Sequence, residues 1–347
     1  GEEIELTEER YYRLSRSTDR RVRKDAFEGI HGTYEAFRNA LGAMYSGSVK
    51  GDLFYSACRR YPSALDASLY GDNIPASVYD TVIDTVRANL APLHEYMALR
   101  RNVLGVPELH MYDIAAPLAK EPKEGIPYDR AEEIVTDGLR LLGEEYLSVL
   151  RKGFSSRWID IYENKGKRKG AYSWGSYGTH PYVLLNYNGT LRDVFTIAHE
   201  MGHALHSWFS HATQPWVYGD YTIFLAEVAS TTNEALLSEH LLSTSDDRER
   251  TLSLLNHDLE QTRTTLYRQT MFAEFERITH SAAERGEALT PDMLCDAWRQ
   301  LNEAYYGPLM TIDGPLAMEW ARIPHFYSAF YVYKYVTGFS AAVSLSR

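Results

Sequence analysis

The sequence predicts a mainly α-helical fold that contains one small β-sheet. Most of the 347 residues fall in stretches whose apolar side chains recur at helical spacing. Residues 157–188 break that pattern and show short alternating runs separated by a polar, glycine-containing connection. Helical spacing then resumes and continues to the last residues. The length and the 44% hydrophobic content are typical of one large globular domain or two modest ones.

Three long helices are expected in the first part of the chain. Thr18 is the expected cap of the first of them, with Gly47 and Gly51 at its end, and Gly105 ends the second. The predicted helices cover residues 18–47, 76–103 and 128–152. The segment 105–127, rich in Lys, Gly and Pro at its end, is the best candidate for a domain boundary. It divides an N-terminal helical part at 1–115 from a larger part at 116–347.

A small sheet and one distinctive helix are expected next. The strand candidates are residues 158–162, 171–174 and 182–187. Thr190 and Asp193 then form a capping-box pattern that starts a helix of roughly four to five turns. Gly202 lies inside this helix, where glycine costs about 1 kcal/mol relative to alanine, so we expect another backbone to approach closely there. The remaining predicted helices cover residues 219–243, 246–285, 291–305 and 324–337.

The composition excludes several classes of partner. The net charge is −11, and the longest basic run is 20–24, which argues against nucleic acid because backbone phosphates demand a basic face. No apolar run is long enough to span a membrane. Cys58 and Cys295 lie far apart without a C-x-x-C, which favours a reducing compartment and argues against a thiolate metal site. Together with the acidic first residues, which resemble no signal peptide, this predicts a cytoplasmic protein.

The most informative residues are His199, Glu200 and His203, which form an H-E-x-x-H pattern. Positions four apart on a helix lie on one face, so the two imidazoles can aim at a single point. Glu200 projects from the same turn and can reach a water held there. The pattern is typical of peptidases in which the histidines bind zinc and the glutamate is the general base. We therefore expect one Zn²⁺ per chain, with Glu200 activating a zinc-bound water; the alternative is two histidines satisfied by hydrogen bonds.

A third protein ligand is needed, because catalytic zinc usually has three and keeps one open position. One known solution places glycine at position 206 and histidine at 209, but this chain has His206 and Phe209. A downstream carboxylate is the alternative, and Glu227 is favoured because it lies in an otherwise apolar run where a buried charge needs a cation. The alternative is a buried salt bridge to an Arg or Lys. The candidates considered are Asp220, Glu227, Glu234 and Glu239.

Two further residues of this region have an expected supporting role. Glu234 follows Glu227 by seven residues on the same face and is interpreted as the acceptor for a ligand histidine N–H. His206 follows His199 by seven and is interpreted either as an outer partner or substrate contact, or as a packed helix histidine.

Eight segments together resemble oligoendopeptidase F, a branch of the thimet-oligopeptidase-like zinc peptidases. They are 170–173, 177–179, 185–190, 199–207, 218–221, 224–231, 324–327 and 330–335. The resemblance implies that His199, His203 and Glu227 bind zinc and that Glu200 activates the water. It also implies a mostly helical fold whose two parts enclose a deep channel that admits oligopeptides. The expected activity is hydrolysis of internal peptide bonds by a zinc metalloendopeptidase.

Other residues are expected to contact the substrate. Donors to the developing oxyanion contribute roughly 3–4 kcal/mol each when preorganised, and the candidates are His325, Tyr333 and Tyr331. On a helix over 324–337, His325 and Tyr333 would lie about 80° apart and face one site; packing is the alternative. Gly170, Ala171 and Tyr172 are the candidates for an edge strand that pairs with substrate backbone.

Two rival functions remain open on the sequence. An amino- or carboxypeptidase could use the same ligand set. A helical peptide-binding protein could retain the metal site without turnover. Peptides blocked at both ends would distinguish the endopeptidase from an exopeptidase.

Overall fold

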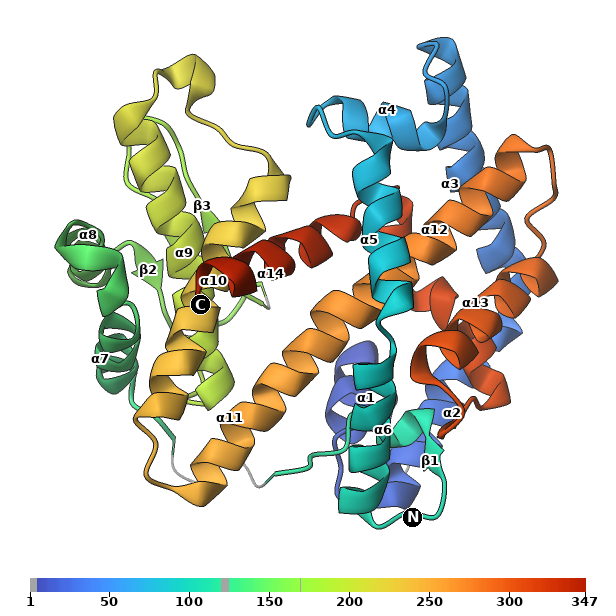
Figure 1. Cartoon of the computed structure of the whole chain (residues 1–347), viewed down its shortest axis with the longest axis horizontal. Helices are drawn as coiled ribbons and strands as arrows, with labels where there is room; N and C mark the ends of the chain where they lie inside the picture. The colour runs from blue at the N-terminus through green and yellow to red at the C-terminus, as the bar shows by residue number, and fades with distance from the viewer. Residues whose placement is uncertain (1–4, 120–124, 169) are drawn as a thin grey trace. The chain divides into compact units, whose positions relative to one another are not determined.

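The computed structural model describes residues 5–119, 125–168 and 170–347. It is mainly helical, as the sequence predicts, and holds two small sheets, of which only the three-stranded one was predicted (Figure 1). The chain divides into two compact units. The first unit comprises residues 1–118 and 261–333, and the second unit comprises residues 119–260 and 334–347. Among the described residues, no helix combines the length and apolar character that a membrane crossing requires.

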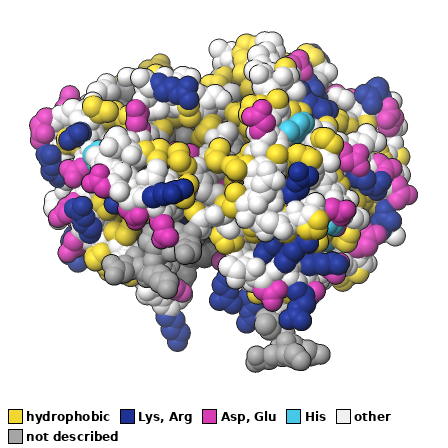
Figure 2. Space-filling view, turned by 60° about the horizontal axis from the view of Figure 1, so that its bottom comes forward, with side chains coloured by type: hydrophobic (Ala, Val, Ile, Leu, Met, Phe, Trp, Pro, Cys, Tyr) yellow, Lys and Arg dark blue, Asp and Glu magenta, His cyan; other side chains and the backbone are white. Residues whose placement is uncertain are grey.

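The charged side chains are mixed in sign on the face that Figure 2 shows. Lys and Arg side chains lie there among Asp, Glu and hydrophobic side chains.

The first unit is a helical assembly around α12. Its α-helices are α1 (Glu8–Leu14), α2 (Arg20–Ala36), α3 (Arg38–Cys58), α4 (Ala64–Tyr70), α5 (Ala76–Ala88), α6 (Ala91–Leu104), α12 (Arg268–Glu284) and α13 (Pro291–Tyr306). Its other elements are the 3₁₀ helices η1 (Met111–Asp113), η5 (Gly314–Arg322) and η6 (Pro324–Tyr327), the π-helix η4 (Thr262–Tyr267), and the parallel strands β1 (Leu109–His110) and β5 (Met310–Thr311). Helix α12 contacts α3, α5 and α13, and the aromatic rings of Phe275, Trp298 and Phe326 pack together between them.

The long helices predicted in this unit are interrupted. The segment 18–47 is α2 followed by α3, with the break at Phe37, and Asp19 rather than Thr18 caps α2. Gly47 and Gly51 lie inside α3. The segment 76–103 is α5 followed by α6, and Pro92 stands in the first turn of α6. The predicted end is confirmed, because Gly105 is the C-cap with φ of 64°.

The predicted helix over 324–337 is wrong. Pro324–Tyr327 forms the short helix η6, and α14 (Tyr333–Leu345) begins only at Tyr333. Between them Phe330 has φ of 59°, a left-handed conformation that costs a non-glycine residue roughly 1–2 kcal/mol and ends any right-handed helix. His325 and Tyr333 therefore do not share a helix, and the rotation argument that placed both at one site does not apply.

The second unit holds the three-stranded sheet and the H-E-x-x-H helix. Its elements are α7 (Tyr128–Gly138), η2 (Arg140–Leu142), α8 (Gly143–Ser155), β2 (Ile159–Asp160), β3 (Tyr172–Trp174), β4 (Tyr182–Leu184), α9 (Leu191–Thr213), η3 (Trp216–Tyr218), α10 (Ile223–Ser243) and α11 (Arg248–Gln261), with nearly all of α14. The strand order is β2-β4-β3, with β2 parallel and β3 antiparallel to β4. The sheet lies next to α9 through β3, as predicted.

One predicted helix of this part is interrupted: the segment 128–152 is α7 and α8 with the 3₁₀ helix η2 between them. The helix predicted over 246–285 is confirmed, since residues 248–284 are continuously helical as α11, η4 and α12, with the π-helical turn of η4 in the middle. The 219–243 helix is confirmed as α10, although it starts at Ile223.

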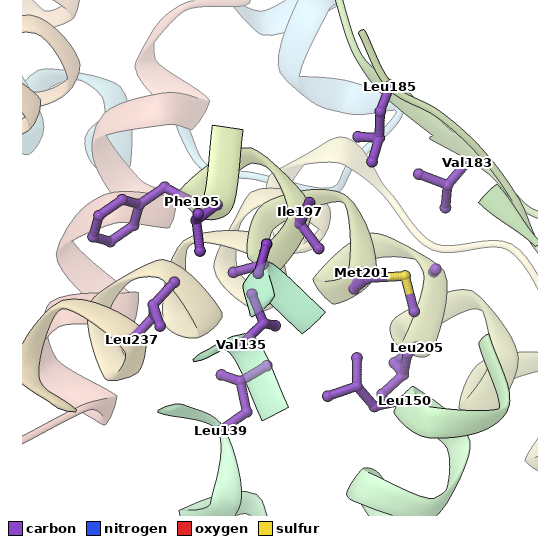
Figure 3. Close-up of a cluster of buried hydrophobic side chains, with 14 of the residues drawn as sticks. Val135, Leu139, Leu150, Val183, Leu185, Phe195, Ile197, Met201, Leu205 and Leu237 are labelled. Atoms are coloured by element: carbon purple, nitrogen blue, oxygen red, sulfur yellow. The ribbon is translucent and has the colours of Figure 1, made fainter. Parts of the chain in front are cut away.

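Helix α9 is buried against α7, α8, α10 and the sheet (Figure 3). Met201 and Leu205 of α9 point into a cluster with Leu150 of α8, and Val183 of β4 belongs to the same core. Each such aliphatic side chain contributes about 1.5–3 kcal/mol when fully buried. The apolar side of α9 is thus fixed in the core, which sets the direction in which the remaining side chains of this helix project.

Candidate metal centre

The start of α9 is fixed by the predicted capping box. The backbone N–H of Asp193 donates to Thr190 Oγ1 at 3.2 Å, and the N–H of Thr190 donates to Asp193 Oδ2 at 2.9 Å. From this start the helix runs without interruption to Thr213. His199 and His203 therefore lie one turn apart on one face, with ring centroids separated by 4.8 Å.

Gly202 allows α9 and α10 to touch, as the sequence analysis expected. A Cβ atom at this position would lie 2.6 Å from Ser230 Cα and 3.0 Å from the Ala229 carbonyl oxygen. Beside this crossing, Asn233 Nδ2 donates to the Ala198 carbonyl at 3.0 Å, and both residues are buried. The close crossing brings the first half of α10, including Glu227, against the histidine face of α9.

Replacing Gly202 by alanine is expected to lower the free energy of unfolding by about 1–3 kcal/mol, because overpacking a close backbone contact forces the helices apart. The midpoint of denaturant unfolding measures this effect. Gly47 is the matched control, since it is an exposed glycine inside α3 where a Cβ would meet no atom within 4 Å. Gly47→Ala should stabilise by up to about 1 kcal/mol. Equal stabilisation by both variants would show that the crossing tolerates a methyl group.

Three ligand-type atoms converge between α9 and α10. One donor atom each from His199, His203 and Glu227 lies within 4.8 Å of the others. Glu227 Oε2 is 3.5 Å from His199 Nε2 and 3.8 Å from His203 Nε2. Two imidazole nitrogens and one carboxylate oxygen at this separation are the donor set of a catalytic zinc site with three protein ligands. Of the other carboxylates considered, Asp220 and Glu239 are exposed, and Glu234 faces the opposite nitrogen of His199.

Each of these three side chains is held by a further contact. Glu234 Oε1 lies 3.4 Å from His199 Nδ1, the nitrogen that does not face Glu227. His203 has a backbone hydrogen bond to Ala226. Ser230 Oγ lies 3.1 Å from Glu227 Oε2 and donates to it. Ligand histidines in zinc proteins usually have such partners, because these fix the tautomer and the direction of the ring.

Glu234→Gln is expected to lower zinc affinity by about 10–100-fold, the usual effect of removing an outer partner of a ligand histidine. Competition with a chelator of known affinity measures the change. Glu239→Gln removes the same charge from an exposed position of α10 and should leave the affinity unaltered, since solvent screens it. Indistinguishable affinities for Glu234→Gln and the wild type would remove Glu234 from this role.

Glu200 is buried beside the three donors. Its side chain is on the same turn as His199, the residue is 6% exposed, and among the described residues its Oε2 atom has no hydrogen-bond partner. Leaving a buried polar atom unpaired costs about 1–3 kcal/mol, and more for a charged group. The site is therefore suited to a partner from outside the chain, such as a cation with its water or a substrate.

The pKa values of this region reflect three carboxylates packed around two imidazoles. Burial lowers the pKa of His199, but the hydrogen bond to Glu234 and the nearby carboxylate charges raise it to about 9. Burial raises the pKa of Glu200 to about 7, although the charge of His199 opposes this. Burial, with the nearby His199, lowers the pKa of His203 to about 3. A divalent cation fits here, because it would balance the carboxylates and favour neutral imidazoles.

His206 contacts Tyr221, a residue that sequence reasoning did not single out. The two rings stack with centroids 3.6 Å apart, and among the described residues His206 Nδ1 is buried without a hydrogen-bond partner. The Tyr221 hydroxyl lies 2.8 Å from Ser207 Oγ and donates to the His203 carbonyl at 3.3 Å. Tyr221 thereby ties the loop before α10 to the histidine helix. A role of His206 beyond this packing stays a prediction.

The remaining predicted site residues lie in two places. His325, Tyr331 and Tyr333 belong to the first unit, where the rings of His325 and Tyr331 stack at 6.2 Å. Tyr333 is fully buried and packs against Tyr79, 5.2 Å between ring centroids. Gly170, Ala171 and Tyr172 belong to the second unit, where Tyr172 begins β3 at the edge of the sheet. Gly170, with φ of 91°, and Ala171 precede the strand, so only Tyr172 of these three residues lies in it, and pairing with substrate backbone stays a prediction.

Known proteins resemble this chain along its whole length. The model of peptidase family M3 matches residues 13–347. Oligopeptidase PepF of Bacillus subtilis is 47% identical over 346 residues, which cover 100% of this chain and 52% of that protein. Group B oligopeptidase PepB of Streptococcus agalactiae is 45% identical over 347 residues, covering 100% and 58%. The crystal structure of oligoendopeptidase-F from Enterococcus faecium matches with a TM-score of 0.78 and 39% identity, covering 99% of this chain and 55% of that one. The chain therefore spans a little over half the length of these relatives.

Proposed function

Because the chain belongs to peptidase family M3, we propose that it carries the metal centre of a zinc endopeptidase that hydrolyses internal peptide bonds of oligopeptides. One observation carries the proposal: the donor atoms of His199, His203 and Glu227 lie within 4.8 Å of one another, with the buried carboxyl group of Glu200 in the same turn of α9. The oligopeptidase names of the relatives support the substrate class.

The residues of the site have different chemical roles. His199, His203 and Glu227 would hold zinc, which when bound lowers the pKa of a water towards about 7 and polarises a carbonyl oxygen. Glu200 accepts the proton of the attacking water through its unpaired carboxylate oxygen and then gives that proton to the leaving amine. Burial supports this role, because it raises the pKa of Glu200 to about 7. Near neutral pH such a carboxyl group can both accept a proton and release it.

Two further sets of residues would bind and orient the peptide. Strand β3, which begins at Tyr172 and pairs with β4 on one side, would pair on its other side with an extended substrate, and such pairing recognises the peptide backbone more than the side chains. His325 and Tyr331 would donate hydrogen bonds to the carbonyl oxygen as it becomes an oxyanion. Burial lowers the pKa of His325, so its ring is a neutral N–H donor at physiological pH.

We also propose a cytoplasmic location and no nucleic-acid or membrane partner. Cys58 is exposed and Cys295 is buried, and both are free thiols, which fits a reducing compartment.

The test combines metal content with cleavage of peptides blocked at both ends. The zinc endopeptidase is expected to hold one zinc ion per chain and to cut such peptides internally. An exopeptidase with the same ligands would leave them intact and would cut their unblocked counterparts from one end. Full zinc loading without hydrolysis of either set would instead favour a peptide-binding protein, and undiminished hydrolysis after complete metal removal would end the proposal.

A further inference from the structure

A strained turn lies between His325 and Tyr331. Phe330 has φ of 59°, although it is not a glycine and carries a bulky side chain. Its ring is 2% exposed and packs against Tyr79, 5.5 Å between centroids, and against His280, at 4.4 Å. A conformation of this kind persists only where the surroundings hold it, and it is found most often at functional sites.

The backbone of this turn is held by a buried glutamate from α12. The N–H of Phe330 donates to Glu276 Oε1 at 2.8 Å, and Glu276 is completely buried. Burial raises the pKa of Glu276 well above its usual range, against the effect of the Phe330 hydrogen bond, and the charge of Asp52 adds to the increase. Burial thus favours the uncharged acid, and Oε1 accepts the Phe330 N–H.

Core stability alone does not account for a carboxyl group at this position. Among the described residues, the other oxygen, Oε2, is buried with no hydrogen-bond partner. An apolar side chain of similar size would fill the same space without leaving a polar atom unsatisfied. What the carboxyl group supplies, and an apolar group cannot, is the acceptor for the Phe330 N–H.

The turn that Glu276 holds connects the two residues assigned to the oxyanion. Ser328 N–H donates to the His325 carbonyl at 2.9 Å, and Tyr331 N–H donates to the Ser328 carbonyl at 3.2 Å. Two successive turns thus lead from His325 to Tyr331, and their rings stack with an interplanar angle of 17°. Phe330 lies inside the second of these turns, so its backbone direction decides where the Tyr331 side chain points.

We propose that Glu276 is a positioning residue: by accepting the hydrogen bond of the left-handed Phe330, it fixes the relative orientation of His325 and Tyr331. The inference rests on the proposed function, because the importance of that orientation follows from the oxyanion role of the pair. In this role Glu276 acts through the backbone of the turn, by way of the Phe330 N–H.

Two variants separate the acceptor from the packing. Glu276→Gln keeps a carbonyl acceptor of the same shape, and Glu276→Leu keeps the volume without an acceptor. Hydrogen exchange of the Phe330 amide is expected to accelerate by about tenfold or more in Glu276→Leu and to change little in Glu276→Gln, in line with the loss or retention of one buried hydrogen bond. With a blocked peptide, kcat should fall about tenfold in Glu276→Leu, with KM and zinc content retained, and glutamine should restore it.

Glu274 provides the matched control on the same helix. It is also buried, but its carboxylate accepts hydrogen bonds from the side chains of Arg87 and Tyr305. Glu274→Leu should lower the unfolding midpoint without changing Phe330 exchange or kcat of the folded fraction. If Glu274→Leu and Glu276→Leu reduce kcat equally, or if Phe330 exchange is the same in Glu276→Leu and the wild type, the positioning role is refuted.

Failure of the proposed function gives a different result. A wild-type chain that binds zinc and cuts no peptide would refute the endopeptidase assignment, whereas the exchange experiment would still report whether Glu276 anchors the turn. Peptide cleavage with unchanged Phe330 exchange in Glu276→Leu would refute the anchor alone.

Discussion

Replacing Glu200 by glutamine is expected to reduce kcat for a blocked peptide by about 10²–10⁴-fold while zinc content stays at one ion per chain. Glutamine fills the same buried space but cannot accept the proton of the attacking water. It leaves His199, His203 and Glu227 unchanged, so the donor set that holds the metal is retained. Steady-state kinetics and metal analysis on one preparation measure both quantities together.

The matched control for this variant is Glu239→Gln, which makes the same chemical change at an exposed position of α10. Its kcat and metal content should equal those of the wild type. A Glu200→Gln enzyme that turns over as fast as the wild type would show that another group takes the proton. A Glu200→Gln chain that loses its zinc would show instead that this carboxylate binds the metal.

Glu227→Ala is expected to weaken zinc binding by more than the 10–100-fold typical of an outer partner, because it removes one of the three proposed direct ligands. The variant should lose zinc under mild chelation that leaves the wild type loaded, and its hydrolysis should fall in proportion to the metal lost. Dialysis against a chelator followed by metal analysis gives the result.

Two comparisons keep this second prediction interpretable. Glu239→Ala on the same helix tests whether any glutamate-to-alanine change in α10 disturbs the site, and it should retain zinc. The helical circular dichroism of Glu227→Ala should match that of the wild type, because the proposed role of Glu227 is to bind the metal and not to pack in the hydrophobic core. Stoichiometric zinc in Glu227→Ala after chelation would exclude it as a ligand.

The sequence was sufficient to predict helix α9, which carries His199 and His203, because the residues that determine this helix lie close together in the sequence. Thr190 and Asp193 cap the helix three residues apart, and His199 and His203 share a face by the geometry of one turn. Gly202 marked the close approach of another backbone, since a glycine inside a helix carries a cost that needs an explanation. The structure shows that this backbone belongs to α10, the helix that also carries Glu227.

The elements that were mispredicted depend on contacts distant in sequence. Nothing in the residues near Phe37 marks the end of α2, because neither proline nor glycine stands there. The left-handed Phe330 is held by Glu276, a partner 54 residues earlier in the chain. A helical pattern of tyrosines continues through Phe330 in the sequence, and this tertiary hydrogen bond, together with the packed ring, opposes it. Periodicity therefore predicted that helices exist but not where these two stop.

Helix α14 bears on the order in which the proposed metal centre forms during synthesis. A Cβ at Gly338 of α14 would lie 3.0 Å from Glu227 Cβ, so α14 packs directly against the residue that supplies the carboxylate. The hairpin of α9 and α10 can emerge from the ribosome and pair early through contacts close in sequence, whereas α14 follows roughly a hundred residues later. A nascent chain would thus bring the two imidazoles and the carboxylate together before α14 covers the flank of Glu227.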